Sequence, residues 1–300
     1  MSPEKYQNLV LFSLVLIAIL SLSYLHWAEK EEKPRSETVK FLPVHGRNLP
    51  LRVPARKKPR RREKWTGYAV ALVIDDVGNS KEMVYRVAEL PRQVTPSVLP
   101  FRKYSLWATL HLKSKGFDVM LHLPMEPQNP ELLEKKMLRV NMSTQEMETR
   151  LEEALREVPL PVGINNHEGS LFTSSEGALR RFFSLLKGRN LFFLDSWTSG
   201  RSRALRLARS MGIRVLRRDV FLDNLPEPDY IKAQWKKLLE VARSKGGAVG
   251  IAHARETTLE VLPELLRSLP PGFKLVRVRH LAKGRPSGDN KQVLSAREGR

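Results

Sequence analysis

The sequence predicts an α/β fold, a distorted (β/α) barrel of seven or eight strands, with an N-terminal membrane segment and a flexible basic linker. Three observations lead to this prediction. Short apolar runs alternate with amphipathic segments from Tyr68 to about His280, and chemically active polar residues follow several of these runs. An uncharged apolar run also occupies residues 9–25. The length of 300 residues suits one such barrel with additional segments.

The apolar run LVLFSLVLIAILSLSYL at residues 9–25 is long enough to cross a bilayer as a helix. Lys5 precedes it, and His26 and Trp27 follow it at a suitable interface position. No small-x-small pattern follows directly, so residues 1–28 are predicted to be a retained signal anchor, with a cleaved signal peptide as the alternative. We therefore expect an envelope protein whose main domain is periplasmic or extracytoplasmic. The Lys and Arg flanking the run favour the opposite orientation when they are counted alone.

The formal net charge of +20 is concentrated in segments poor in core-forming residues. Residues 47–64 carry nine Lys and Arg against Glu63 alone. Residues 29–66 are therefore predicted to be a disordered basic linker, and residues 283–300 a disordered tail. A basic tether beside a membrane suits anionic lipid or an acidic polymer as a partner. Nucleic acid is a disfavoured partner because no recognition motif accompanies the charge.

The barrel is predicted to occupy residues 67–282, with alternating strands and helices. Ser143 and Glu146 form a capping box ahead of one apolar helical stripe, and a second stripe around Phe182 stops at Gly188. The predicted strands are short runs rich in Val, Ile, Leu and Phe, as expected for strands covered on both faces. They lie at residues 69–74, 94–100, 117–123, 161–165, 190–195, 212–216, 248–252 and 273–278.

Polar side chains end five of these runs, and the carboxyl ends of barrel strands converge on one rim. Because the chain has no cysteine, any metal is left to His, Asp and Glu. A carboxylate and two imidazoles suffice to bind zinc or a similar ion, while a second carboxylate accepts a proton from water and a further His protonates the leaving group. The residues at these ends are Asp75 and Asp76, His122 with Glu126 four positions later, Asn165, Asn166, His167 and Glu168, Asp195 and Ser196, and His253.

This pattern predicts metal-assisted hydrolysis. Nucleotide hydrolysis, serine esterase and thermolysin-like chemistry are disfavoured, because the sequence has no Walker loop, GxSxG elbow or HExxH motif.

Six motifs in order resemble those of the divergent polysaccharide deacetylases, distant relatives of carbohydrate esterase family four. The resemblance covers about residues 68–281 and implies a distorted (β/α) barrel, one divalent metal ion such as zinc, and removal of acetyl groups from an N-acetylated glycan. The motifs are VIDDVG (73–78), HLPMEP (122–127), GINNHEGS (163–170), FLDSWT (193–198), RDVFLDN (218–224) and GIAH (250–253).

The resemblance also implies roles for individual residues. Asp75 resembles the general base, and His253 resembles the general acid. Asp195 would orient a catalytic group or contact substrate. Apart from the resemblance, Asn166 is a candidate for substrate contact, and Trp197 suits either stacking on a sugar ring or partial burial in the core. The implied metal ligands are Asp76, His122 and His167.

One departure from the family pattern concerns Glu126, which stands before Pro127 where better-studied relatives have a second metal histidine. Glu126 could bind the metal, orient a ligand or only shape its loop, and His167 is favoured as the third ligand. The family's arginine-proline-tyrosine stretch has no clear match, which leaves substrate orientation open. Asp219, Asp223 and Asn224 suit either the rim or a capped turn. The alternative function is an inactive barrel that binds envelope glycan or acts as a scaffold, and the sequence does not specify an oligomeric state.

Overall fold

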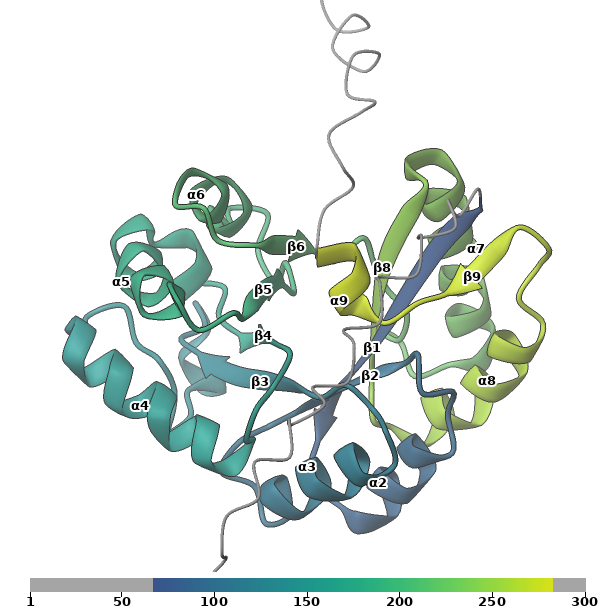
Figure 1. Ribbon diagram of the computed structural model, residues 1–300, viewed down its shortest axis with the longest axis horizontal. Helices are drawn as coiled ribbons and strands as arrows, with labels where there is room; N and C mark the ends of the chain where they lie inside the picture. Colours follow the sequence, from purple (N-terminus) through teal and green to yellow (C-terminus); the bar gives the residue numbers. More distant parts are fainter. Residues whose placement is uncertain (1–66, 283–300) are drawn as a thin grey trace, which may run out of the picture. The chain divides into compact units, whose positions relative to one another are not determined.

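The computed structural model describes residues 67–282, and their strands form one parallel sheet that curls into a distorted barrel with helices on its outer face (Figure 1). The strands are β1 (Tyr68–Val77), β2 (Thr95–Val98), β3 (Met120–Met125), β4 (Gly163–Glu168), β5 (Phe192–Asp195), β6 (Val215–Arg217), β7 (Val220–Phe221), β8 (Gly247–His253) and β9 (Phe273–Leu275). The helices are α2 (Lys81–Ala88), α3 (Ser105–Ser114), α4 (Thr144–Glu157), α5 (Glu176–Leu186), α6 (Ala204–Ser210), α7 (Pro228–Lys245), α8 (Glu256–Arg267) and α9 (Val278–Ala282), with short 3₁₀ turns at Pro130–Leu132 and Phe172–Ser174.

The two edges of the curled sheet meet at a joint of two residues. The strand order is β6-β5-β4-β3-β2-β1-β8-β7, so the edge strands β6 and β7 are consecutive in the chain and only Arg218 and Asp219 separate them. The Arg218 N–H donates to the Asp195 carbonyl on β5 at 3.0 Å, and the Asp219 N–H donates to the Val249 carbonyl on β8 at 2.8 Å. One bent segment therefore spans both edges, and β6 and β7 serve as two halves of one barrel strand.

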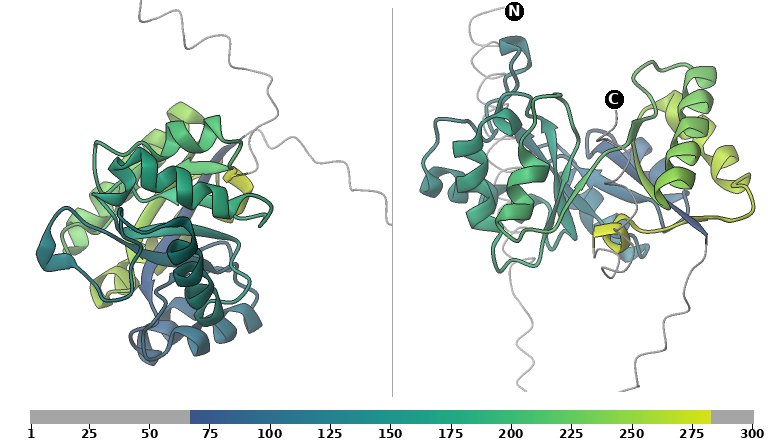
Figure 2. Two further views of the ribbon diagram at one scale, coloured as in Figure 1. Left: turned by 90° about the vertical axis from the view of Figure 1, so that its left-hand side faces the viewer. Right: turned by 90° about the horizontal axis from the view of Figure 1, so that it is seen from above.

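Both faces of the sheet are buried, which explains why the strands are continuous apolar runs. On β1, Leu72 and Ile74 pack in the main core that includes the outer helices. Ala71 and Val73 belong to a smaller core inside the barrel, where Val278 of α9 packs against them. The views in Figures 1 and 2 place α9 within the curl of the sheet, close to β6 and β8. The amino-terminal end of the barrel is thus plugged, and its carboxyl-terminal rim carries the polar residues.

The predicted helices follow from their end signals. The capping box at the start of α4 is present, with the Ser143 hydroxyl accepting from the Glu146 N–H and the Glu146 carboxylate accepting from the Ser143 N–H. The apolar stripe of α5 is fully buried and the helix ends at Leu186, shortly before Gly188. The buried stripe of α5 packs on β5, where Phe182 and Phe183 contact Phe193, and α4 packs against α5 and β3.

The predicted strands match observed strands with shifts at their ends, but the last predicted strand is shorter. The run at residues 273–278 ends as a strand at Leu275, and α9 then begins at Val278. The two-residue strand β7 was not predicted from the sequence.

The predicted anchor, linker and tail at residues 1–28, 29–66 and 283–300 lie outside the described residues. Within residues 67–282, none of the helices has both the length and the apolar character needed to span a bilayer.

Candidate functional site

The adjacent aspartates at the end of β1 both belong to the rim because the strand is irregular there. Neighbouring side chains of a regular strand point to opposite faces. Asp76, however, has a φ of 60°, and the pairing of β1 with β2 shifts register between Ile74 and Val77. Such a bulge redirects side chains at the end of a strand. Asp75 is buried, whereas Asp76 approaches the histidines of the neighbouring strands.

Asp76, His122 and His167 bring three potential metal ligands together from β1, β3 and β4. The Asp76 Oδ1 lies 3.4 Å from His122 Nε2 and 3.2 Å from His167 Nδ1, and the two ring nitrogens lie 3.1 Å apart. Tetrahedral ligands placed 2.0–2.1 Å from a zinc ion would be about 3.3 Å from one another. The three atoms therefore have the spacing of one face of a tetrahedral metal site.

The bonding around Asp76 also fits a cation. Asp76 Oδ1 is buried, and among the described residues its contacts with the two imidazoles lack hydrogen-bond geometry. Burial alone would raise the pKa of Asp76, but His122 and His167 outweigh it and hold that pKa well below its usual range. Burial would lower the pKa of His167, but Asp76 and Glu134 raise it to about 10. A divalent cation that binds here must displace the proton of His167.

Asp75 lies beside this group, and its carboxylate is held by the side-chain amide of Asn165. The sequence analysis noted Asn165 as a polar strand end without giving it a role. The Asn165 Nδ2 lies 3.0 Å from both Asp75 carboxylate oxygens, and the Asn165 Oδ1 accepts from the Ser97 hydroxyl at 2.5 Å. The Asp75 Oδ2 is 3.6 Å from His122 Nε2. Burial raises the pKa of Asp75, opposed by the charges of His122 and His253. A buried carboxylate with a raised pKa is suited to accept a proton near neutral pH.

His253 stands next to Asp75 because the two residues are register partners on β8 and β1. Its Nδ1 is 2.9 Å from Asp223 Oδ1, and its backbone N–H donates to Asp223 Oδ2 at 2.8 Å. The Thr258 hydroxyl donates to the same Oδ2, and the Phe221 ring stacks on the imidazole at 5.1 Å between centroids. Burial would lower the pKa of His253, but Asp223 outweighs it and raises that pKa.

Two other predicted residues brace the rim. Asp195 accepts from the Trp197 N–H at 2.9 Å and from the Ser202 hydroxyl at 2.7 Å, and its pKa is raised by burial. Asn166 is buried, donating to the Glu168 carbonyl and accepting from the Ser196 N–H. Substrate contact by Asp195 or Asn166 stays a prediction.

Glu126 lies outside the three-ligand group. Its Oε2 accepts from the Val140 N–H at 2.7 Å, which matches the loop-shaping alternative among the three left open by the sequence. Trp197 has a φ of 50° and lies at the rim with the Arg217 guanidinium 4.1 Å from its ring centroid, so Arg217 already covers part of that ring. Its contact with a sugar stays a prediction.

Three residues of the site had no assigned role in the sequence analysis. Asn165 was noted only as a polar strand end, and Asp223 suited a capped turn equally well. Glu134 lies 3.2 Å from His167 Nε2, but it belongs to an irregular loop between β3 and α4, where no periodic pattern indicates its position.

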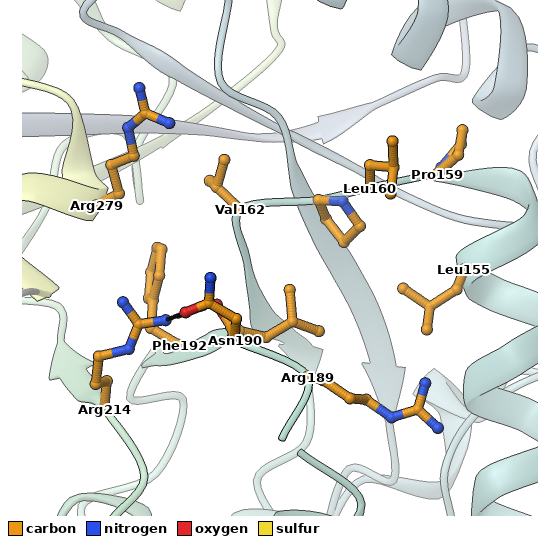
Figure 3. Close-up of a pocket in the computed structure, with 11 residues that line it drawn as sticks. Leu155, Pro159, Leu160, Val162, Arg189, Asn190, Phe192, Arg214 and Arg279 are labelled. Atoms are coloured by element: carbon orange, nitrogen blue, oxygen red, sulfur yellow. Dashed lines mark hydrogen bonds between the residues drawn. The ribbon is translucent and has the colours of Figure 1, made fainter. Parts of the chain in front are cut away.

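A hollow of about 780 Å³ lies at the amino-terminal end of the strands, opposite the rim (Figure 3). Its wall is apolar apart from three arginines and Asn190, which accepts a hydrogen bond from Arg214. Its lining contains no histidine or carboxylate, so it lacks the groups for the hydrolysis predicted at the rim. The lining residues are Leu155, Pro159, Leu160, Pro161, Val162, Arg189, Asn190, Leu191, Phe192, Arg214 and Arg279.

Comparisons with known proteins identify the family of the chain and its fold. The family model for divergent polysaccharide deacetylase matches residues 72–282. The uncharacterized protein YibQ of Escherichia coli K12 is 35% identical over 212 residues, which cover 71% of this chain and 66% of YibQ. An uncharacterized protein of Haemophilus influenzae is 34% identical over 212 residues, covering 71% of this chain and 76% of that protein.

The fold also has a solved counterpart. The crystal structure of the uncharacterized protein ATU2773 from Agrobacterium tumefaciens C58 superposes with a TM-score of 0.69 at 23% identity, covering 72% of this chain and 89% of that chain. This likeness shows the fold of the chain. An inference about its activity has to rest on the residues at the rim.

Proposed function

Because the chain belongs to the divergent polysaccharide deacetylase family, we propose that it is a metal-dependent hydrolase that removes N-acetyl groups from an envelope polysaccharide or a peptidoglycan-type glycan. One observation carries the proposal. The ligand atoms of Asp76, His122 and His167 converge at 3.1–3.4 Å, with the carboxylate of Asp75 beside them.

The three converging residues would hold a divalent cation such as zinc, which supplies Lewis acidity and makes water a stronger nucleophile. Asp75 accepts the proton of the attacking water, and the two contacts from Asn165 keep its carboxylate in place. The two roles explain why two aspartates are adjacent: Asp76 would bind the cation, and Asp75 would accept the proton.

His253 donates a proton to the departing sugar amine. Its Nδ1 faces Asp223, so its Nε2 is the atom that can serve the substrate. The charge of Asp223 raises the pKa of His253, which keeps the imidazole protonated for this step. The base and the acid stand side by side because Asp75 and His253 are register partners.

The proposal includes a location in the cell envelope, with the barrel outside the cytoplasm and anchored through the apolar run at residues 9–25. The length and apolar character of that run support it. The glycan substrate would then be a polymer of the same compartment.

The test is acetate release from a panel of acetylated envelope glycans by the full chain, together with elemental analysis of bound metal. We expect Asp75→Asn to retain metal and to lose about 10²–10⁴-fold in turnover, because it removes the proton acceptor alone. His122→Ala should lose both the metal and the activity.

Lys236→Ala on α7 provides a matched surface control and should keep both properties. Full turnover by Asp75→Asn would contradict the assigned roles. A folded chain that binds no metal and releases no acetate after zinc, cobalt or nickel is supplied would favour the glycan-binding or scaffold alternative.

A further inference from the structure

The two histidines of the metal site differ in what their second ring nitrogens contact. The His122 Nδ1 is buried and has no hydrogen-bond partner among the described residues. The His167 Nε2, in contrast, lies 3.2 Å from Glu134 Oε1. A neutral imidazole offers a lone pair at one nitrogen only, so the partner of the other nitrogen decides which one can bind a metal.

Glu134 is placed to support His167, and it is not a further ligand of the same ion. It contacts the Nε2 edge of the ring, whereas Nδ1 on the other edge faces Asp76 and His122. Glu134 is also absent from the group of ligand atoms that lie within 4.8 Å of one another. A proton on Nε2 that is donated to Glu134 leaves the Nδ1 lone pair directed at the metal site.

Glu134 is itself held by an arginine. The Arg102 Nη2 donates to both Glu134 oxygens at 2.8 Å, and the two side chains are 29% and 26% exposed. The Arg102 N–H donates to the buried Ser105 hydroxyl, which in turn donates to the Leu99 carbonyl. These hydrogen bonds therefore fix the backbone of Arg102 in the loop between β2 and α3. The Arg102 charge offsets that of Glu134, so Glu134 orients His167 without adding net charge to the site.

We propose that Glu134, held by Arg102, is a positioning residue that fixes His167 with its Nδ1 available to the metal. This inference rests on the metal-binding part of the proposed function. Because His122 lacks a comparable partner among the described residues, the orientation of the ligand set depends more on Glu134 than on any contact of His122.

The test measures metal affinity in the absence of substrate, with Zn²⁺ alone in competition with a chromophoric chelator and the full chain as the protein. Glu134→Gln keeps the shape of the side chain and removes its charge. We expect its Zn²⁺ affinity to fall about 10–100-fold, the usual effect of losing such a support. Glu131→Gln, an exposed carboxylate of the same loop, is the matched control and should bind Zn²⁺ as the unaltered chain does.

A second variant and a spectroscopic readout separate positioning from folding. Arg102→Lys keeps a cation near Glu134 but loses the guanidinium, and we expect a smaller loss of affinity in the same direction. With Co²⁺ in place of Zn²⁺, the visible absorption bands should change in Glu134→Gln and stay unchanged in Glu131→Gln, because these bands report ligand geometry.

The outcomes are distinct. Unchanged Zn²⁺ affinity and Co²⁺ bands in a folded Glu134→Gln variant overturn the positioning role and leave the proposed hydrolase intact. If Glu134→Gln fails to fold, unchanged affinity and bands in Arg102→Lys overturn it instead. An unaltered chain that binds neither ion overturns both proposals. Weaker metal binding by Glu134→Gln in a chain that releases no acetate supports the positioning role and contradicts only the proposed activity.

Discussion

Asp223 is a buried carboxylate that raises the pKa of the neighbouring His253. It contacts the Nδ1 and the backbone N–H of His253 and accepts from Thr258, and it has no solvent exposure. Burial would raise the pKa of Asp223, but the hydrogen bond to His253 outweighs it and lowers that pKa. The pKa of His253 is raised in turn. This pair therefore controls the pH range in which His253 can donate a proton.

We expect Asp223→Asn to move the alkaline limb of the pH profile of kcat/KM to lower pH. The variant keeps an acceptor for the Nδ1 proton but loses the charge that raises the pKa of His253, so the acid form is lost earlier as the pH rises. On that limb the rate falls tenfold for each unit by which the pKa drops. Asp219→Asn, which removes a carboxylate paired with Lys245 in the same segment, should leave the limb in place. An unmoved limb in Asp223→Asn would exclude His253 as the titrating acid.

The same pair contributes to folding stability in a defined pH window. The contribution of His253 is complete below its unfolded pKa of about 6.5 and is lost as the pH rises through its higher folded pKa. The contribution of Asp223 is complete above its unfolded pKa of about 3.8 and is lost as the pH falls through its lower folded pKa. The pair is thus most stabilising in weakly acidic solution between these limits.

At the level of strands and loops, Gly169 fixes the turn that follows His167. Its φ is 86°, and a Cβ added there would lie 2.9 Å from the Met125 Cβ on β3. The position therefore requires glycine for two reasons, a left-handed backbone and a close approach between β3 and the loop after β4.

We expect Gly169→Ala to lower the free energy of unfolding by more than the matched substitution Gly188→Ala. Gly188 also has a positive φ, 80°, but has no atom within 4 Å of an added Cβ. Its substitution should cost only the backbone strain, about 1–2 kcal/mol, whereas Gly169→Ala adds the clash with Met125. Urea unfolding of the two variants measures the difference. Equal losses would show that Met125 moves aside freely.

The sequence predicted the strands better than the joints between them. The buried runs of β1, β3 and β8 are long and apolar, so their pattern alone identifies them. The two residues of β7 are too few to produce a pattern, and β7 is a strand only because β8 lies beside it. The strand β9 also ends earlier than predicted, because the Val276 N–H makes the last hydrogen bond to β1 and α9 begins at Val278, with both side chains in the inner core.

The site was predictable to the extent that strand ends identify a rim. Asp76, His122 and His167 were placed together from this rule and from the family resemblance, and the structure brings their ligand atoms within reach of one ion. Glu134 could not be found this way, because a loop without periodicity does not reveal its contacts. The pairing of Asp223 with His253 depends on how β7 and β8 lie in space. The sequence around Asp223 does not show this arrangement, because it suits a capped turn as well as a residue at the rim.

At the scale of the whole molecule, the three candidate metal ligands Asp76, His122 and His167 come from three strands, β1, β3 and β4. A cation that binds the folded chain and not the unfolded one stabilises the entire barrel, by about 2.7 kcal/mol at a hundredfold excess over Kd.

We therefore expect added Zn²⁺ to raise the thermal unfolding midpoint of the full chain by about 5–10 °C, given about 2–4 °C per kcal/mol for a domain of this size. A chelator should reverse the increase. His122→Ala should show no increase, whereas His111→Ala on the outer helix α3 should show the same increase as the unaltered chain. A midpoint that does not respond to Zn²⁺ would argue against a site shared by the three strands.

The joint at Arg218 and Asp219 also divides the residues of the candidate site into two sets along the chain. The candidate metal ligands and Asp75 all precede it, whereas His253 and its partner Asp223 follow it. Cutting the backbone at this joint would yield two fragments, each with only part of the group of residues proposed for catalysis. Their reunion would rely chiefly on the seven register pairs between β1 and β8, which include Asp75 with His253. The barrel is therefore a natural candidate for complementation between separately produced halves, in which recovered turnover would report on correct reassembly.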